Sequence, residues 1–197
     1  MGGFILNYNP EEAYIENLKE ISSKLQELDN ILFEYPTRLH YSIEEIEWCA
    51  LLIRKILEKI AFGILILNYN LYLENGGKTD EWNIKIILKI LNKGSNKEVF
   101  LKMLPWEDGK IHCYGKSKIM NQERFFQIYN QVSGIIHEKN PFKLSKINKN
   151  NMKLKDKLDL IRDEIVIILN RHEISGIKII MKEICKNNSN YFGATWG

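Results

Sequence analysis

The sequence has few of the residues that build disulfide-linked, loop-rich or metal-binding proteins. Its 197 residues include only three cysteines, four prolines and four histidines. The cysteines are scattered and form no CxxC pair, which argues against a disulfide framework or a zinc site and favours a reducing, cytoplasmic setting. A glycine-rich phosphate loop and a nucleophile elbow are also missing. We therefore predict neither a metal nor a cofactor, and the sequence carries no complete catalytic motif.

Long hydrophobic runs and a strong charge of one sign are missing as well. The main stretch without charge, residues 60–73, is shorter than the roughly 20 apolar residues that a membrane-spanning helix needs. The first residues, MGGFILNYN, lack the basic and long apolar regions of a signal peptide. The net charge of +3 permits a local basic patch but does not by itself indicate nucleic-acid binding. We expect a soluble protein that does not enter a membrane.

The chain is organised around a long apolar segment, residues 42–73. Ser42 and Glu45 have the spacing of a capping box, in which each side chain bonds to the backbone amide of the other residue. From Ile60 onward the segment is apolar on every side, which is typical of a helix in the centre of a bundle. We predict one long central helix.

Periodic patterns predict further helices around this segment. Asn9-Pro10 is a helix start, and the apolar residues from Tyr14 to Leu32 then recur at heptad spacing. This seam indicates either an antiparallel neighbour in the bundle or a homodimer interface, and both interpretations are open. The remaining helices are predicted over residues 81–92, with Asp80 as cap and Trp82 on the apolar face, 122–137, with Asn121 as cap, and 152–171.

Two short β-hairpins complete the predicted fold. One lies near residues 98–115, and the other joins strands at 177–184 and 191–196. The predicted fold class is mainly α: a helical bundle of four main helices plus a short one, with a C-terminal β-hairpin. Three segments are expected in one domain: a helical core at 1–142, a basic linker at 143–153, and the last helix and hairpin at 154–197.

The central helix carries a pair of opposite charges in an apolar setting. Arg54 and Glu58 are one helical turn apart, so their side chains lie on one face. They are either a solvated ion pair or an inward-facing pair at a site. Because apolar residues surround both positions, we predict that the pair is largely buried, so that removing one partner would strand a charge.

Among the histidines, His137 has the most informative position. It ends an apolar helix and is followed by EKNPF. It is either a helix-terminal cap, where the helix dipole favours a protonated imidazole, or a functional residue beside Arg54 and Glu58. A histidine that moves protons and an arginine that stabilises phosphate charge are the minimal equipment for cleaving RNA. His40 and His172 adjoin helix ends, so we expect local caps or surface residues.

Two segments carry a family resemblance. IEWCALLIRKILEKIAFG in the central helix and IYNQVSGIIHEKNPF at the end of the later helix, within a helical frame, resemble the HEPN superfamily over residues 10–142. That family comprises small helical bundles, many of them RNases in toxin–antitoxin, abortive-infection and CRISPR-linked defence. Its active-site Arg and His stand close together on one helix, whereas Arg124 here stands at the start of the helix that His137 ends. The resemblance therefore implies His137 in the histidine role and an arginine from another helix.

Two function classes remain open. The first is a defence or toxin-type effector that cleaves RNA without metal, with His137 as general acid and base and Arg54 as the group that stabilises phosphate charge. Glu58 would orient Arg54, and Asn140 would supply a hydrogen bond. The basic stretch is either a solvated linker or the holder of the RNA backbone, through Lys143, Lys146, Lys149 and Lys153. The second class is a non-catalytic binding or regulatory module, either a defence-system subunit or an antitoxin-like partner.

Overall fold

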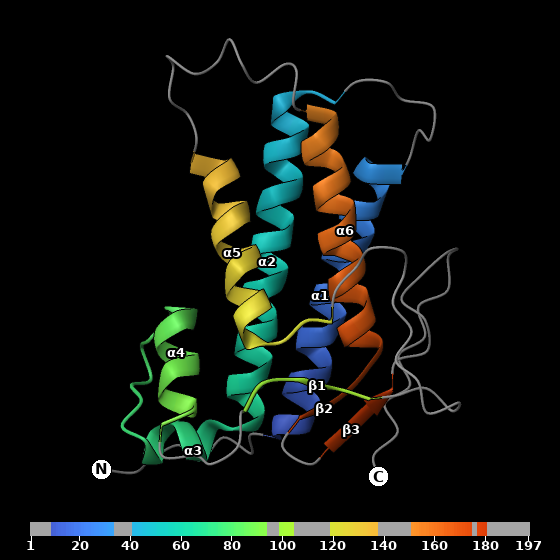
Figure 1. The fold of residues 1–197 in the computed structure, drawn as a ribbon. Coiled ribbons are helices and arrows are strands. Elements are labelled where there is room, and N and C mark those ends of the chain that lie inside the picture. Colours follow the sequence, from blue (N-terminus) through green and yellow to red (C-terminus); the bar gives the residue numbers. More distant parts are fainter. Residues whose placement is uncertain are drawn as a thin grey trace.

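Four long helices surround one hydrophobic core, with a small sheet at one end of the bundle (Figure 1). The computed structural model describes residues 9–33, 41–93, 99–104, 119–137, 151–174 and 177–180, the side chains of residues 137, 177 and 180 excepted. The long helices are α1 (Pro10–Phe33), α2 (Ile43–Leu67), α5 (Gln122–His137) and α6 (Asn151–Asn170). The short elements are α3 (Tyr69–Glu74), α4 (Ile84–Leu91), β1 (Lys102–Met103), β2 (Arg171–Ile174) and β3 (Ile177–Ile180). The predicted fold class is confirmed.

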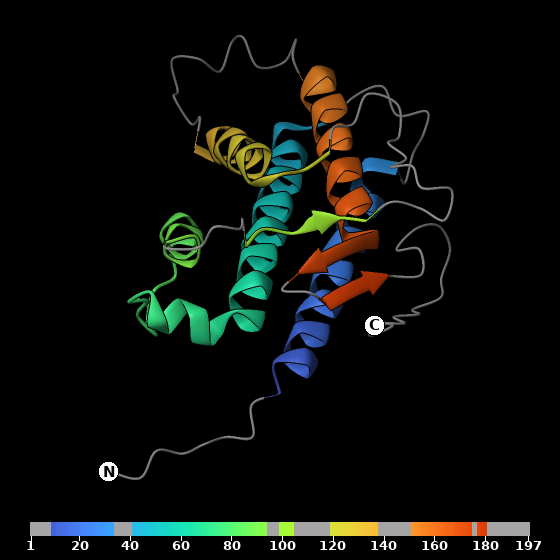
Figure 2. The ribbon, with the colours of Figure 1, turned by 60° about the horizontal axis from the view of Figure 1, so that its bottom comes forward.

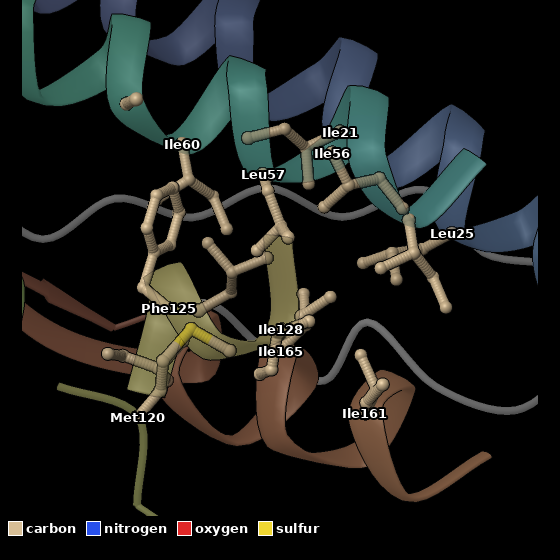
Figure 3. Packing of buried hydrophobic residues seen from close by; sticks show 14 of the residues in the cluster. Ile21, Leu25, Ile56, Leu57, Ile60, Met120, Phe125, Ile128, Ile161 and Ile165 are labelled. Carbon is tan, nitrogen blue, oxygen red and sulfur yellow. The ribbon is translucent and has the colours of Figure 1, made fainter. Parts of the chain in front are cut away.

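Helix α2 lies in the centre of the bundle. Figures 1 and 2 show α1 and α6 on one side of it and α4 and α5 on the other. Apolar side chains from all four long helices meet between them, as Figure 3 shows for Leu25, Leu57, Phe125 and Ile165, which are fully buried. Burying each such side chain contributes about 1.5–3 kcal/mol to folding. The long helices therefore share a single core.

The heptad seam of α1 faces this core. Helix α1 runs antiparallel along α2 (Figure 1), and every seam residue is at most 3% exposed. The buried seam residues are Tyr14, Leu18, Ile21, Leu25, Leu28 and Leu32. The seam is therefore an internal contact between neighbouring helices, and its side chains are not exposed to a second chain.

The predicted central helix is divided into two helices. Its capping box is present, because Ser42 Oγ accepts from the amide of Glu45 (3.2 Å) and Glu45 Oε2 accepts from the amide of Ser42 (2.8 Å). However, α2 ends at Leu67 and α3 begins at Tyr69. Between them the Asn68 side chain donates to the carbonyl of Ile64 (2.8 Å), and such local bonds compete with the helical pattern. The prediction of one continuous helix to residue 73 was wrong at this point.

Helix α4 starts later than the sequence pattern predicts. Its N-cap is Asn83, whose side chain accepts from the amide of Lys85 (3.0 Å), and not Asp80. The buried face is made of Ile84, Ile87, Leu88 and Leu91. Trp82 precedes the helix and is 76% exposed, so its predicted place on the apolar face was wrong. Because Trp82 lies outside the helix, the helical spacing that put it on the apolar face does not apply to it.

The sheet is assembled from strands far apart in the sequence. Strand β1 pairs antiparallel with β2, and β2 pairs antiparallel with β3. The C-terminal hairpin therefore joins residues 171–174 to 177–180, whereas the predicted partner strand at 191–196 lies outside the described residues. Most of the hairpin predicted at 98–115 also lies outside them, and in the described part β1 pairs with β2. Helix α6 ends at Asn170. Partly buried and buried residues then alternate along β2, as in a strand with one face on the core.

Helix α6 begins inside the predicted basic linker. It starts at Asn151, so residues 151–153 are helical, while residues 143–150 lie outside the described part of the chain. Helix α6 packs against α1 and α2, which places the last long helix on the same core as the others. No helix among the described residues is long and apolar enough to cross a membrane.

Candidate functional site

A group of polar side chains lies where α2 meets α4 and α5. Helix α2 contributes Arg54 and Glu58, α4 contributes Lys85, and α5 contributes Tyr129 and Asn130. We call these five residues the Arg54 cluster. The two neighbouring helices bury the rest of their apolar faces against α2, so the cluster lies at the edge of the core and is only partly covered.

One carboxylate oxygen organises the Arg54 cluster. Glu58 Oε1 accepts from Arg54 Nε (3.0 Å) and from the Tyr129 hydroxyl (3.1 Å). The Arg54 guanidinium also lies over the Tyr129 ring, 5.3 Å from its centroid, within the range of cation–π attraction. Arg54 is therefore held both by a charged hydrogen bond and by an aromatic face.

Lys85 extends the Arg54 cluster toward α4. Its Nζ donates to Asn130 Oδ1 (2.9 Å) and lies 6.0 Å from the centroid of the Tyr129 ring. Two cations therefore approach one aromatic ring, while a single carboxylate, Glu58, balances only one of them. The cluster carries a net positive charge, which suits an anionic ligand such as a phosphate.

The protonation states follow from burial and from the Glu58 carboxylate. Burial disfavours the charged form of Arg54, but the hydrogen bonds and charges of Glu58 and Tyr129 together outweigh it, so the pKa of Arg54 is raised. Burial and then the charge of Glu58 raise the pKa of Tyr129. At neutral pH Arg54 is therefore a cation and Tyr129 a neutral hydrogen-bond donor.

The prediction for Arg54 and Glu58 is correct in one part and wrong in the other. The two side chains are paired, as predicted. They are not largely buried, because the Arg54 side chain is 26% exposed and that of Glu58 is 32% exposed. Tyr129 of α5 covers part of the pair, and the rest stays in contact with water.

His137 is the last residue of α5, and its side chain is outside the described residues. Tyr129 lies eight residues earlier on the same helix, about 12 Å along its axis, and it is Tyr129 that contacts Arg54 and Glu58. The proximity of His137 to Arg54 therefore stays a prediction.

The other predicted site residues are placed only in part. Asn140 and three of the predicted RNA-binding lysines lie outside the described part of the chain: Lys143, Lys146 and Lys149. Lys153 is an exposed residue in the first turn of α6. The residues that complete the Arg54 cluster, Tyr129, Lys85 and Asn130, were missed, because no local pattern links α4 and α5 to a charge on α2.

A second polar pair is fully enclosed in the core. His172 on β2 was expected to be a cap or a surface residue, but it is fully buried, so the surface expectation was wrong. Its Nδ1 lies 3.1 Å from the carbonyl oxygen of Leu169, which can only accept, so Nδ1 carries the proton. Nε2 then accepts from the Tyr14 hydroxyl at 2.7 Å. The pair ties α1 to the sheet, and both residues are buried.

A third polar contact joins α5 to α6. Arg124 donates from Nε and Nη2 to the two carboxylate oxygens of Glu164, at 2.8 and 3.0 Å. Glu164 is buried, and a bidentate pair of this kind fixes geometry as well as charge. Arg124 is therefore engaged at the base of α5, at the opposite end of that helix from His137.

Known proteins give no further information about the site. No protein-family model, curated protein or solved structure matches the chain. Within the described residues, no three His, Cys, Asp or Glu side chains are grouped so that they could hold a metal ion. In the Arg54 cluster, polar side chains from three helices meet and stay partly exposed. We therefore take it as the candidate site.

Proposed function

We propose that the protein is a HEPN-like defence or toxin-type effector that acts on RNA, and that the α2–α5 edge is its working surface. One observation carries the proposal: Arg54 is oriented and only partly covered on the helix that packs against α5, the helix that ends in His137. A cytoplasmic location and RNA as ligand belong to the same proposal.

The proposed roles follow from the chemistry of each side chain. Arg54 stabilises the negative charge that develops on a phosphate, and His137 donates and accepts the protons of the reaction. Glu58 orients Arg54 through the 3.0 Å bond to Nε, so it is a positioning residue. Asn140 supplies a hydrogen bond from the segment after α5.

Lysines outside the Arg54 cluster hold the RNA backbone in this proposal. Lys153 is exposed on α6 and follows three more lysines in the sequence, at 143, 146 and 149. Phosphate contacts by lysine release counterions, so binding should weaken steeply as the salt concentration rises.

An RNA-degradation assay in EDTA tests the proposal. The wild type should degrade RNA, and His137→Ala should lower the rate by about 10²- to 10⁴-fold, the usual contribution of a general acid or base. Arg54→Ala should lower it by roughly 10²- to 10³-fold, as for other groups that stabilise transition-state charge. The matched control is Lys59→Ala, which removes a cation from the same helix where it pairs with Glu20 of α1. Cleavage that survives His137→Ala would remove this mechanism.

The second candidate function is a non-catalytic binding or regulatory module. It is favoured by the way in which Glu58 Oε1 binds both Arg54 and Tyr129, as in a network that serves the fold. In that case the wild type would bind RNA or a partner protein of a defence system without degrading any RNA. Such a result in the assay above would replace the first candidate with the second.

A further inference from the structure

The outer face of α4 combines an exposed aromatic ring with a row of cations. Trp82, just before the helix, is 76% exposed and Ile86 is 41% exposed. Lys85, Lys89 and Lys93 are exposed as well. Within α4, Lys85 and Ile86 are four and three residues before Lys89, so these exposed residues share the face of the helix that turns away from the core.

Trp82 is held in this position by the turn around it. Glu81 Oε1 accepts from the amide of Asn83 (2.7 Å), and the Asn83 side chain caps α4. Both neighbours of Trp82 are thus fixed by hydrogen bonds, while the indole is left outside. These bonds order the backbone on either side of the indole, so little freedom of that part of the chain is lost when a ligand binds.

The charge of this face favours an anionic ligand. Residues 82–93 contain three lysines and no acidic residue. Asp80 and Glu81 precede them, and Glu81 is engaged with the Asn83 amide. Lys85 and Lys89 lie about 6 Å apart along the axis of α4, which matches about two nucleotide spacings of 3.4 Å.

The face is continuous with the Arg54 cluster through Lys85. Its Nζ reaches Asn130 and approaches the Tyr129 ring, and Tyr129 in turn contacts Arg54. Figure 2 shows α4 at the edge of the molecule, beside α2 and α5. Lys85, Tyr129 and Arg54 are therefore in contact, and we refer to them together with Trp82, three residues before Lys85, as the strip.

We infer that this strip binds single-stranded RNA, with a base stacked on Trp82 and phosphates near Lys85, Lys89 and Arg54. The inference rests on the proposed function and extends it by naming single-stranded RNA and the surface that holds it. A flat exposed indole among cations suits a base and its phosphate, because stacking is tolerant of sequence and the backbone supplies the charge. An acidic peptide would satisfy the lysines but would leave the ring without a planar partner.

Fluorescence anisotropy with a short labelled 2′-O-methyl oligouridylate, which resists cleavage, tests the inference. Trp82→Ala should weaken binding by about five- to hundred-fold, and Trp82→Tyr should recover most of the loss. Lys89→Ala should lower the slope of log K against log salt by about 0.7. The matched control is Trp48→Ala, because Trp48 is also exposed but lies on α2, where its Nε1 donates to Glu27 of α1.

The outcomes separate this inference from the proposed function. If the wild type binds the oligonucleotide and Trp82→Ala binds it equally well, the strip is wrong while the RNA function stands. If a polyglutamate peptide binds with the same dependence on Trp82, the occupant is an acidic protein and the inference fails. If the wild type neither binds the oligonucleotide nor degrades RNA, both proposals fail together.

Discussion

Two groups of polar side chains on opposite sides of α2 differ in how far water reaches them. On the side of α1 and α6, Asn17 donates to the carbonyl of Lys59 (2.8 Å) and Tyr14 donates to His172, and all three side chains are buried or nearly so. On the side of α4 and α5, Arg54 and Tyr129 also have partners, but water reaches them. The first side fixes the helices in one arrangement, and the second keeps oriented charges within reach of a ligand.

On the α1 side of α2 the two helices approach each other closely. At Gly63 of α2, an added Cβ would come within 2.7 Å of Tyr14 and 2.8 Å of Asn17, so α1 lies directly against the α2 backbone. Gly134 of α5, by contrast, is exposed, and an added Cβ there meets nothing within 4 Å. Close approach excludes water and forces every polar group to find a partner. Arg54 and Glu58 are only partly covered, so these charged side chains keep contact with water.

The largest expected effect compares the same truncation on the two sides. Leu28→Ala in the α1–α2 contact should lower the free energy of unfolding by about 2–5 kcal/mol, because Leu28 is fully buried and a cavity would remain. Leu73→Ala on α3, beside α4, should cost less than about 1 kcal/mol, because Leu73 is exposed. Urea unfolding measures both. Equal costs would show that the α3–α4 region is as tightly packed as the α1 seam.

The next effect is a pH dependence of stability, which the buried His172 beside α1 should create. Burial lowers the pKa of His172 to about 4, from an ordinary value of 6.5. The unfolded chain therefore takes up a proton as the pH falls through 6.5, while the folded chain does so only near pH 4. The contribution of the neutral His172 to the free energy of unfolding is fully present above pH 6.5. It should decline by up to about 3 kcal/mol between pH 6.5 and pH 4.

Denaturant unfolding at a series of pH values measures this dependence. In His172→Gln the amide oxygen can still accept from Tyr14, but the group no longer titrates, so this part of the slope should vanish. A wild-type stability that stays flat between pH 6.5 and pH 4 would contradict the enclosed, neutral histidine.

A pair of glycine substitutions should move stability in opposite directions. Gly63→Ala should cost about 1–3 kcal/mol, because the new methyl group displaces the Tyr14 ring and Asn17. Gly134→Ala lies inside α5 with open space around it and should stabilise by about 0.5–1 kcal/mol. Thermal unfolding of the two variants measures both changes in stability. A gain of stability in both variants would mean that α1 can move away from α2 at little cost.

The sequence predicted the features that local chemistry sets. The cap of α1 is Asn9, whose Oδ1 accepts from the amides of Glu11 and Glu12. Asn121 accepts from the amide of Arg124 at the start of α5, and both ends of α5 agree with the predicted range. In each case the partners are two or three residues apart, so a short motif contains all the information.

The features that the sequence did not predict depend on distant partners. His172 and Tyr14 are 158 residues apart, and Tyr129 and Glu58 are 71 apart. Whether a polar side chain is enclosed or reached by water depends on which helices cover it, and no local pattern records that. Trp82 shows the same limit, because a shift of the α4 start by one turn moved it from the predicted core to the surface.

Arg54→Ala is expected to have the smallest effect on stability, and it tests the comparison at the open edge. A buried ion pair that loses one partner costs about 3–5 kcal/mol, whereas exposed pairs and cation–π contacts contribute up to about 1 kcal/mol each. Because water reaches both Arg54 and Glu58, we expect a cost of about 0.5–1 kcal/mol that shrinks as salt is added. The control is Lys59→Ala, which breaks the partly exposed pair with Glu20.

The size of the Arg54→Ala effect also determines how the RNA assay is interpreted. A cost near 1 kcal/mol leaves the chain folded, since domains are stable by about 5–15 kcal/mol. Any loss of RNA cleavage or binding in this variant can then be assigned to the Arg54 cluster and not to unfolding. A cost near 3 kcal/mol would instead mean that Arg54 is a desolvated structural charge. Glu164 of α6, which pairs with Arg124 of α5, is such a charge. The polar groups beside α4 and α5 would then be as buried as those beside α1. That result would support the non-catalytic binding module.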